Sequence, residues 1–241
     1  MRSSVKTPQN PLARTWRQGN ILPLLSMEIK AVSRNPFLAL SFSSNVILAG
    51  VLVFLLFYRE HAMDRAGTLW AMALLAAIPS MNYATFCFAK DGLYYQGYMT
   101  RLSVSDYARW KVLFMHVYSL GCSVLLLPFI LRGEPWMIFT FWSFVVYYMG
   151  FGGILMLYVS SFDRNKIRLS AAPIFNAQGV SLWKVLFVMP VTTPLFFFQG
   201  VQELAVWLTL LLGAGGLFLT KASTAIIGQN LAKRKHRYLA L

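Results

Sequence analysis

Six long apolar runs constrain the fold of this 241-residue chain more than any other feature. A helix needs about 20 mostly apolar residues to cross the hydrocarbon core of a bilayer, and soluble helices rarely run that long without charge. Apart from Lys184, no Asp, Glu, Lys or Arg lies inside these runs. The sequence therefore predicts an all-α polytopic membrane protein with six transmembrane helices. The predicted spans are residues 37–58, 68–89, 112–131, 135–162, 182–199 and 204–220.

The distribution of positive charge predicts the orientation of these spans. With the N-terminus inside, the inner segments hold 19 of the 22 Lys and Arg residues, and the outer loops hold only Arg59, Arg65 and Arg132. Positive residues flank the cytoplasmic ends of membrane helices, so both termini are expected in the cytoplasm. The same distribution explains the net charge of +14 without a nucleic-acid partner.

The remaining segments flank the predicted transmembrane domain, residues 37–220. Residues 1–20 are polar and basic and predict a cytoplasmic tail, and residues 221–241 predict a second, basic one that contacts anionic lipid headgroups. Between them, residues 21–36 predict an amphipathic elbow helix in the membrane interface, because Leu22, Leu25, Ile29 and Val32 share one face. The alternative is a cytosolic extension of the first span.

The chain carries no recognisable catalytic or cofactor-binding motif. It has no phosphate-binding loop of the GxxxxGK[ST] form, no HExxH sequence and no paired cysteines with metal-ligand spacing. We therefore predict no catalytic residue, no cofactor, no metal site and no enzymatic activity, so that any ATP hydrolysis belongs to a partner chain. Within the spans, Asn45 and Asn82 are the main polar residues; they either line a pathway or form hydrogen bonds between helices.

Two groups of glycines lie inside predicted spans. Gly150, Gly152 and Gly153 belong to the fourth span, and Gly213, Gly215 and Gly216 belong to the sixth. Glycine lets membrane helices approach closely, so both groups predict packing surfaces. A hinge is the alternative for the first group.

The inner loop between the second and third spans is longer than a connector requires. Its first half, KDGLYYQGYMTR, predicts one or two helical turns with Asp91 near their start. Its second half predicts a helix that begins at Ser103 or Ser105 and runs into the third span, since Ser103 and Asp106 have the spacing of a capping box. An aromatic belt with a long loop accounts for Tyr107 but not for a short helix before it.

The chain resembles ABC-2-type transporter permeases in the order of its segments. The likeness rests on MEIKAVSRNP, on KDGLYYQGYMTR with the downstream Lys111, on RNKIRLSAAPIFNAQGVS with Pro190 and Pro194 after it, and on KRKHRYLA. It is closest to an uncharacterised bacterial family of ABC-2-like membrane proteins, whose C-terminal half it resembles.

The resemblance implies a function, a location and a set of partners. The chain would be the permease subunit of an ABC-type exporter in the bacterial cytoplasmic membrane, paired with a second copy or a related permease half. A separate ATP-binding cassette ATPase would dock on the loop 90–111, with Asp91, Tyr95, Arg101 and Asp106 as the candidate coupling residues. The alternative is a non-transporting membrane anchor or assembly subunit with an exporter-like fold.

Overall fold

The regular secondary structure of the described part of the chain is entirely helical. The computed structural model describes residues 22–34, 36–57, 64–88, 91, 102–162, 189–198 and 200–239, and none of these lies in a β-strand. The α-helices are α2 (Leu22–Ser33), α3 (Pro36–Phe57), α4 (Arg65–Phe86), α6 (Val104–Ile130), α7 (Pro135–Tyr147), α8 (Gly153–Ser160), α10 (Gln202–Phe218) and α11 (Thr220–Leu239). A π-helix, η1 (Tyr148–Gly152), joins α7 to α8, and a 3-10 helix, η2 (Thr193–Phe197), precedes α10.

Several of these helices suit a membrane by length and composition. Within the described residues, α4, α6 and the continuous α7–η1–α8 are long and apolar enough to cross a bilayer, and α10 with α11 adds a fourth span if the bent pair counts as one. The prediction of a helical membrane protein is confirmed at this level. The number of spans, six, and the cytoplasmic location of both termini stay predictions. Of the predicted span 182–199, only residues 189–198 are described, and they contain η2.

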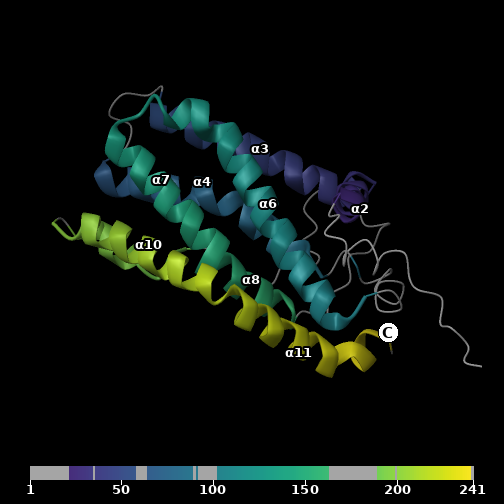
Figure 1. The fold of residues 1–241 in the computed structure, drawn as a ribbon. Helices are drawn as coiled ribbons and strands as arrows, with labels where there is room; N and C mark the ends of the chain where they lie inside the picture. The colour runs from purple at the N-terminus through teal and green to yellow at the C-terminus, as the bar shows by residue number, and fades with distance from the viewer. Residues whose placement is uncertain are drawn as a thin grey trace, which may run out of the picture.

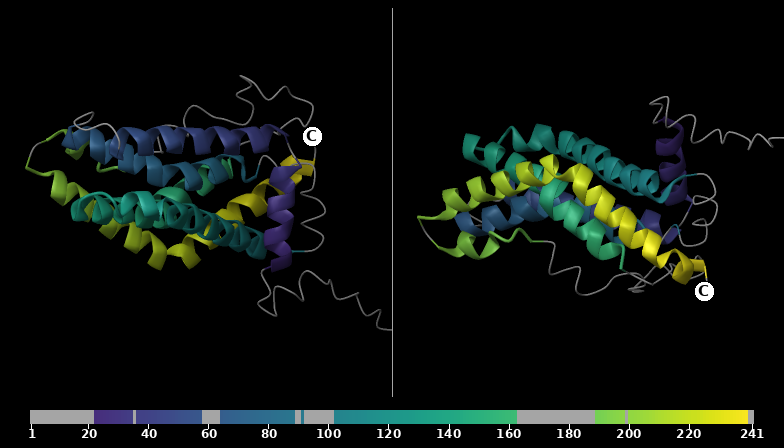
Figure 2. Two further views of the ribbon diagram at one scale, coloured as in Figure 1. Left: turned by 90° about the horizontal axis from the view of Figure 1, so that it is seen from above. Right: turned by 60° about the horizontal axis from the view of Figure 1, so that its bottom comes forward.

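The helices form an elongated bundle with one helix across its end. In Figure 1, α3, α4, α6, α7 and α10 run along the long axis, whereas α2 is seen end-on. The view from above in Figure 2 shows α2 lying steeply across the ends of the other helices. The start of α6 and the end of α11 lie at this α2 end, and the α6–α7 turn and the start of α10 lie at the opposite end. A helix across the end of a bundle suits a membrane surface, but the interfacial position of residues 21–36 stays a prediction.

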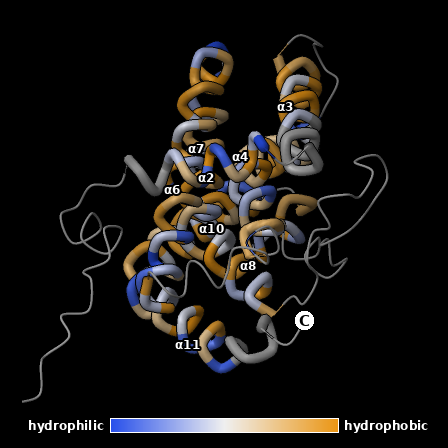
Figure 3. Tube along the Cα trace, turned by 90° about the vertical axis from the view of Figure 1, so that its right-hand side faces the viewer, coloured by the Kyte–Doolittle hydropathy of each residue, from blue (hydrophilic) through white to orange (hydrophobic). Residues whose placement is uncertain are grey.

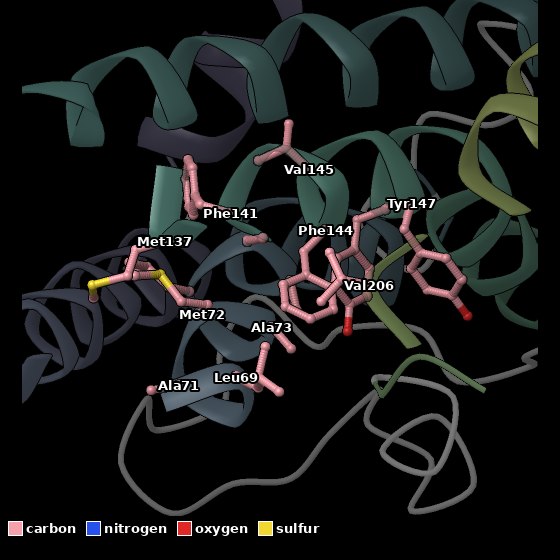
Figure 4. Close-up of a cluster of buried hydrophobic side chains, with 14 of the residues drawn as sticks. Leu69, Ala71, Met72, Ala73, Met137, Phe141, Phe144, Val145, Tyr147 and Val206 are labelled. Carbon is pink, nitrogen blue, oxygen red and sulfur yellow. The ribbon is translucent and has the colours of Figure 1, made fainter. Parts of the chain in front are cut away.

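Two clusters of buried apolar side chains hold the bundle together. The larger one joins α4, α7 and α10, where Leu69, Met72 and Phe144 are at most 1% exposed. Figure 4 shows these side chains between the helices. The second cluster joins α4, α6, α8 and α11 at the α2 end. Other large apolar side chains point outward, for example Leu125 at 76% exposure. Such a surface fits lipid. In Figure 3, most of α3 correspondingly has the colour of hydrophobic residues.

The prediction that the glycines form packing surfaces is confirmed at the contact between η1 and α10. A Cβ atom on Gly150 would lie 1.9 Å from the carbonyl oxygen of Gly213, and one on Gly213 would lie 2.5 Å from the backbone nitrogen of Tyr147. A Cβ atom on Gly216 would likewise lie 2.4 Å from the backbone nitrogen of Phe151. The two backbones therefore touch directly, and only glycine fits between them. Gly215 differs, since nothing lies within 4 Å of its added Cβ atom.

The segment predicted as a basic tail begins as a packed helix. Helix α11 turns away from α10 by 66° and lies against α6 and α8. Its Ile227 and Leu231 are 1% exposed, and the Asn230 side-chain amide donates a hydrogen bond of 2.5 Å to the Ser161 hydroxyl. The spacing of Ile227 and Leu231, one helical turn apart, is the sequence signal for this buried face. In Figure 3, α11 alternates hydrophilic and hydrophobic positions accordingly.

Candidate functional site

Three charged side chains meet in a buried cluster at the α2 end of the bundle. The Lys111 ammonium forms an ion pair with a carboxylate oxygen of Glu28 and another, at 2.5 Å, with a carboxylate oxygen of Asp91. The side chains of Lys111, Glu28 and Asp91 are only 1%, 3% and 2% exposed. Buried charges of this kind are stable only when they are paired and hydrogen-bonded. We call these three residues the ion cluster.

Two tyrosine hydroxyls complete the ion cluster. The hydroxyl of Tyr107 donates a 2.7 Å hydrogen bond to Asp91, and that of Tyr83 donates a 3.3 Å bond to Glu28. The Lys111 ammonium also lies 5.1 Å from the centre of the Tyr107 ring, a distance suited to a cation–π contact. Because two carboxylates share one ammonium, each tyrosine donor offsets part of the remaining negative charge.

Each member of the ion cluster comes from a different segment. Glu28 lies on the crossing helix α2, Lys111 lies two turns into α6, and Asp91 follows the end of α4. Tyr83, in the last turns of α4, lies with Tyr107 in the apolar cluster that surrounds these charges. The ion cluster therefore ties the crossing helix to two membrane helices and to the first part of the predicted coupling loop.

A cap at Ser103 fixes where α6 begins, and hence the position of Lys111. The Ser103 hydroxyl accepts a hydrogen bond of 3.1 Å from the backbone N–H of Asp106 and donates one of 2.7 Å to the Asp106 carboxylate. The structure thus decides between the two predicted caps in favour of Ser103. The Asp106 side chain is also acidic in the first turn, where it suits the helix dipole.

We expect Ser103→Ala to lower the free energy of unfolding by about 1 kcal/mol, because α6 loses its N-terminal cap. Ser105→Ala is the matched control, since Ser105 is exposed and lies two residues after the cap, and it should change stability by less than about 0.5 kcal/mol. The measurement is thermal unfolding of the full-length protein in mild detergent. Equal effects of the two substitutions would contradict the assigned cap.

Of the residues predicted from the sequence as a site, those that the structure describes lie in different settings. Asp91 is in the ion cluster, whereas Asp106 forms the cap of α6. Tyr95 and Arg101 lie outside the described residues. Asn82 is 5% exposed within α4, and Asn45 lines an apolar groove of about 440 Å³ between α3, α4 and α6.

Sequence reasoning missed the roles of Glu28 and Lys111. Lys111 entered the sequence analysis only as part of the resemblance to ABC-2-type permeases, and Glu28 was assigned to neither face of the predicted elbow helix. A signal was present, because Glu28 comes three residues after Leu25 and four before Val32, on their side of the helix. An acid that is buried along an apolar helix face requires a partner.

One protein-family model matches almost the whole chain. Residues 3–240 match a family described as "Family of unknown function (DUF5687)". The chain belongs to this family. No match was found among curated proteins or solved structures.

Proposed function

We propose that this DUF5687 chain is the permease subunit of an ABC-type exporter, located in the bacterial cytoplasmic membrane with both termini inside. A separate ATPase supplies the energy through the loop 90–111, and two permease halves enclose the pathway for the substrate. The proposal combines the resemblance of the sequence to ABC-2-type permeases with the geometry at the α2 end.

The ion cluster is the observation that carries the proposal. Asp91, at the start of the proposed docking segment 91–101, is held in a buried ion pair with Lys111 of α6, which is also paired with Glu28 of α2. A force applied to this segment therefore acts on the crossing helix and on a membrane helix together. Such a rigid joint is what transmission of ATP-driven closure to a bundle requires, because packed elements move as bodies.

A second candidate, a non-transporting anchor or assembly subunit, is favoured by the cavities. Two of them, of about 670 and 440 Å³, are lined mainly by apolar side chains, among them Leu211 and Leu125 at 64% and 76% exposure. Among the described residues, charge inside the bundle is confined to the closed ion cluster. Grooves of this kind suit lipid or another helix better than a polar substrate.

The test is reversal of a charge in the docking segment outside the ion cluster. We expect Arg101→Glu to lower the ATPase activity that co-purifies with the protein from mild detergent by at least about tenfold, because coupling or docking is lost. Lys221→Glu is the matched control, since Lys221 is exposed at the start of α11 and lies outside the loop 90–111. It should leave the activity within about twofold of wild type.

The outcomes separate the two candidates. If no ATPase co-purifies with the wild-type protein, the exporter proposal fails. If an ATPase co-purifies but Arg101→Glu changes neither assembly nor activity, the coupling role of the segment fails, and the anchor is favoured. Asp91 is unsuitable for this test, because its substitution disrupts a buried ion pair and confounds coupling with folding.

A further inference from the structure

A pocket of about 340 Å³ opens at the end of the bundle opposite α2, away from the proposed coupling surface. The first turns of α4, α7 and α10 surround it. Its floor is buried, since Leu69, Thr140 and Val206 are 1%, 2% and 4% exposed. The volume falls in the range of about 300–1,000 Å³ that is usual for small-molecule sites.

Opposite charges lie together at the rim of this pocket. A guanidinium nitrogen of Arg65 is 2.9 Å from a carboxylate oxygen of Glu203, and the two side chains are 51% and 80% exposed. Ion pairs so exposed contribute only about 0–1 kcal/mol to stability. A ligand that brings its own positive and negative groups can therefore replace this pair at little energetic cost.

Aromatic rings form the walls. The Arg65 guanidinium lies 5.4 Å from the centre of the Trp136 ring, and the rings of Phe139 and Trp207 pack with their centres 4.7 Å apart. Trp207 is 53% exposed, so part of its ring is open to a ligand cation. An aromatic belt at a membrane interface accounts for exposed tryptophans, but it does not account for a charge pair above a buried floor.

We propose that this pocket binds a zwitterionic group with an ammonium and an anionic oxygen a few bonds apart, as in the headgroup of an ethanolamine or choline phospholipid. The anionic oxygen pairs with Arg65, and the ammonium pairs with Glu203 beside the Trp207 ring. A purely anionic ligand would face the Glu203 carboxylate, and a purely cationic one would face the Arg65 guanidinium. The apolar floor takes the hydrocarbon that adjoins a headgroup.

Native mass spectrometry of the full-length protein in mild detergent tests this site. Phosphatidylethanolamine and phosphatidylglycerol with identical acyl chains are titrated separately, and the bound fraction is compared. We expect the zwitterionic lipid to bind about tenfold more tightly, equivalent to about 1.4 kcal/mol. Equal retention of the two lipids would overturn the proposal.

Two variants assign the preference to the pocket. Glu203→Gln should reduce the preference for phosphatidylethanolamine to within about twofold, because the ammonium loses its carboxylate partner. Arg132→Gln, which removes a cation at the same end but outside the pocket lining, should leave the preference unchanged. An unchanged preference in Glu203→Gln would overturn the proposal.

A competition arm identifies the source of the zwitterion. Soluble phosphoethanolamine is added to the lipid-bound protein at millimolar concentration. Displacement of the lipid supports a site that also takes free zwitterions, whereas retention supports a site specific for lipids. Because the pocket and Asp91 lie at opposite ends of the bundle, failure here leaves the exporter proposal to its own test.

Discussion

Substitution of Lys111 by Met is expected to destabilise the protein by about 3–5 kcal/mol, the usual result of removing one partner from a buried ion pair. The substitution leaves Glu28 and Asp91 buried without the ammonium that pairs with both. Two buried carboxylates then repel each other in a medium of low dielectric constant. The measurement is the free energy or midpoint of unfolding of the full-length protein in mild detergent.

A rescue and a control separate the ion cluster from a general effect of the substitution. The triple variant Glu28→Gln, Asp91→Asn, Lys111→Met removes all three charges and should recover most of the lost stability, because neutral polar groups are less costly to bury. Lys221→Met removes an exposed cation at the start of α11 and should change stability by less than about 0.5 kcal/mol. If Lys111→Met is as stable as wild type, the ion cluster is not a structural joint.

The second large effect is expected for Gly213→Ala. The added methyl group would lie 2.5 Å from the backbone nitrogen and 2.6 Å from the Cα atom of Tyr147. Because backbone atoms cannot move aside as a flexible side chain does, α10 has to separate from α7 and η1. We expect a loss of about 3 kcal/mol, at the upper end of what overpacking costs. Thermal unfolding in detergent measures it.

Gly215 provides a control two residues away in the same helix. An added Cβ atom there meets nothing within 4 Å, so Gly215→Ala should be tolerated and should stabilise α10 by up to about 1 kcal/mol. Similar losses for the two alanine variants would show that helix flexibility, rather than close backbone contact, decides the need for glycine at position 213.

The features predictable from the sequence are those that depend on local patterns. Run length identified the segments that became α3, α4, α6 and α7–η1–α8, and the spacing of Ser103 and Asp106 identified the cap of α6. The glycine groups indicated close packing, although nothing in the sequence indicated the π-helix η1. This π-helix leaves the Met149 carbonyl oxygen 2.7 Å from a ring nitrogen of His116, a partner in another helix.

The ion cluster could not be predicted from a local sequence pattern. Lys111 is 83 residues from Glu28, and Tyr107 is 16 residues from Asp91. Each charge has an ordinary interpretation in isolation: Glu28 as a polar position of an elbow helix, Lys111 as an interfacial cation, and Asp91 as a helix N-terminal acid. Only the crossing of α2 over the ends of α4 and α6 brings the three side chains together.

The separation of Glu28 from Lys111 also sets an order of events during synthesis. Ribosomes add about 5–20 residues per second, so the 83 residues between these two positions take roughly 4 to 17 seconds to make. Throughout that interval the Glu28 carboxylate cannot pair with the Lys111 ammonium, and burying the carboxylate without this partner is costly. We therefore expect α2 to stay in contact with water until α6 has left the ribosome, and to reach its final position only then. Although α2 is made before the other described helices, we expect it to be among the last of them to reach its final position.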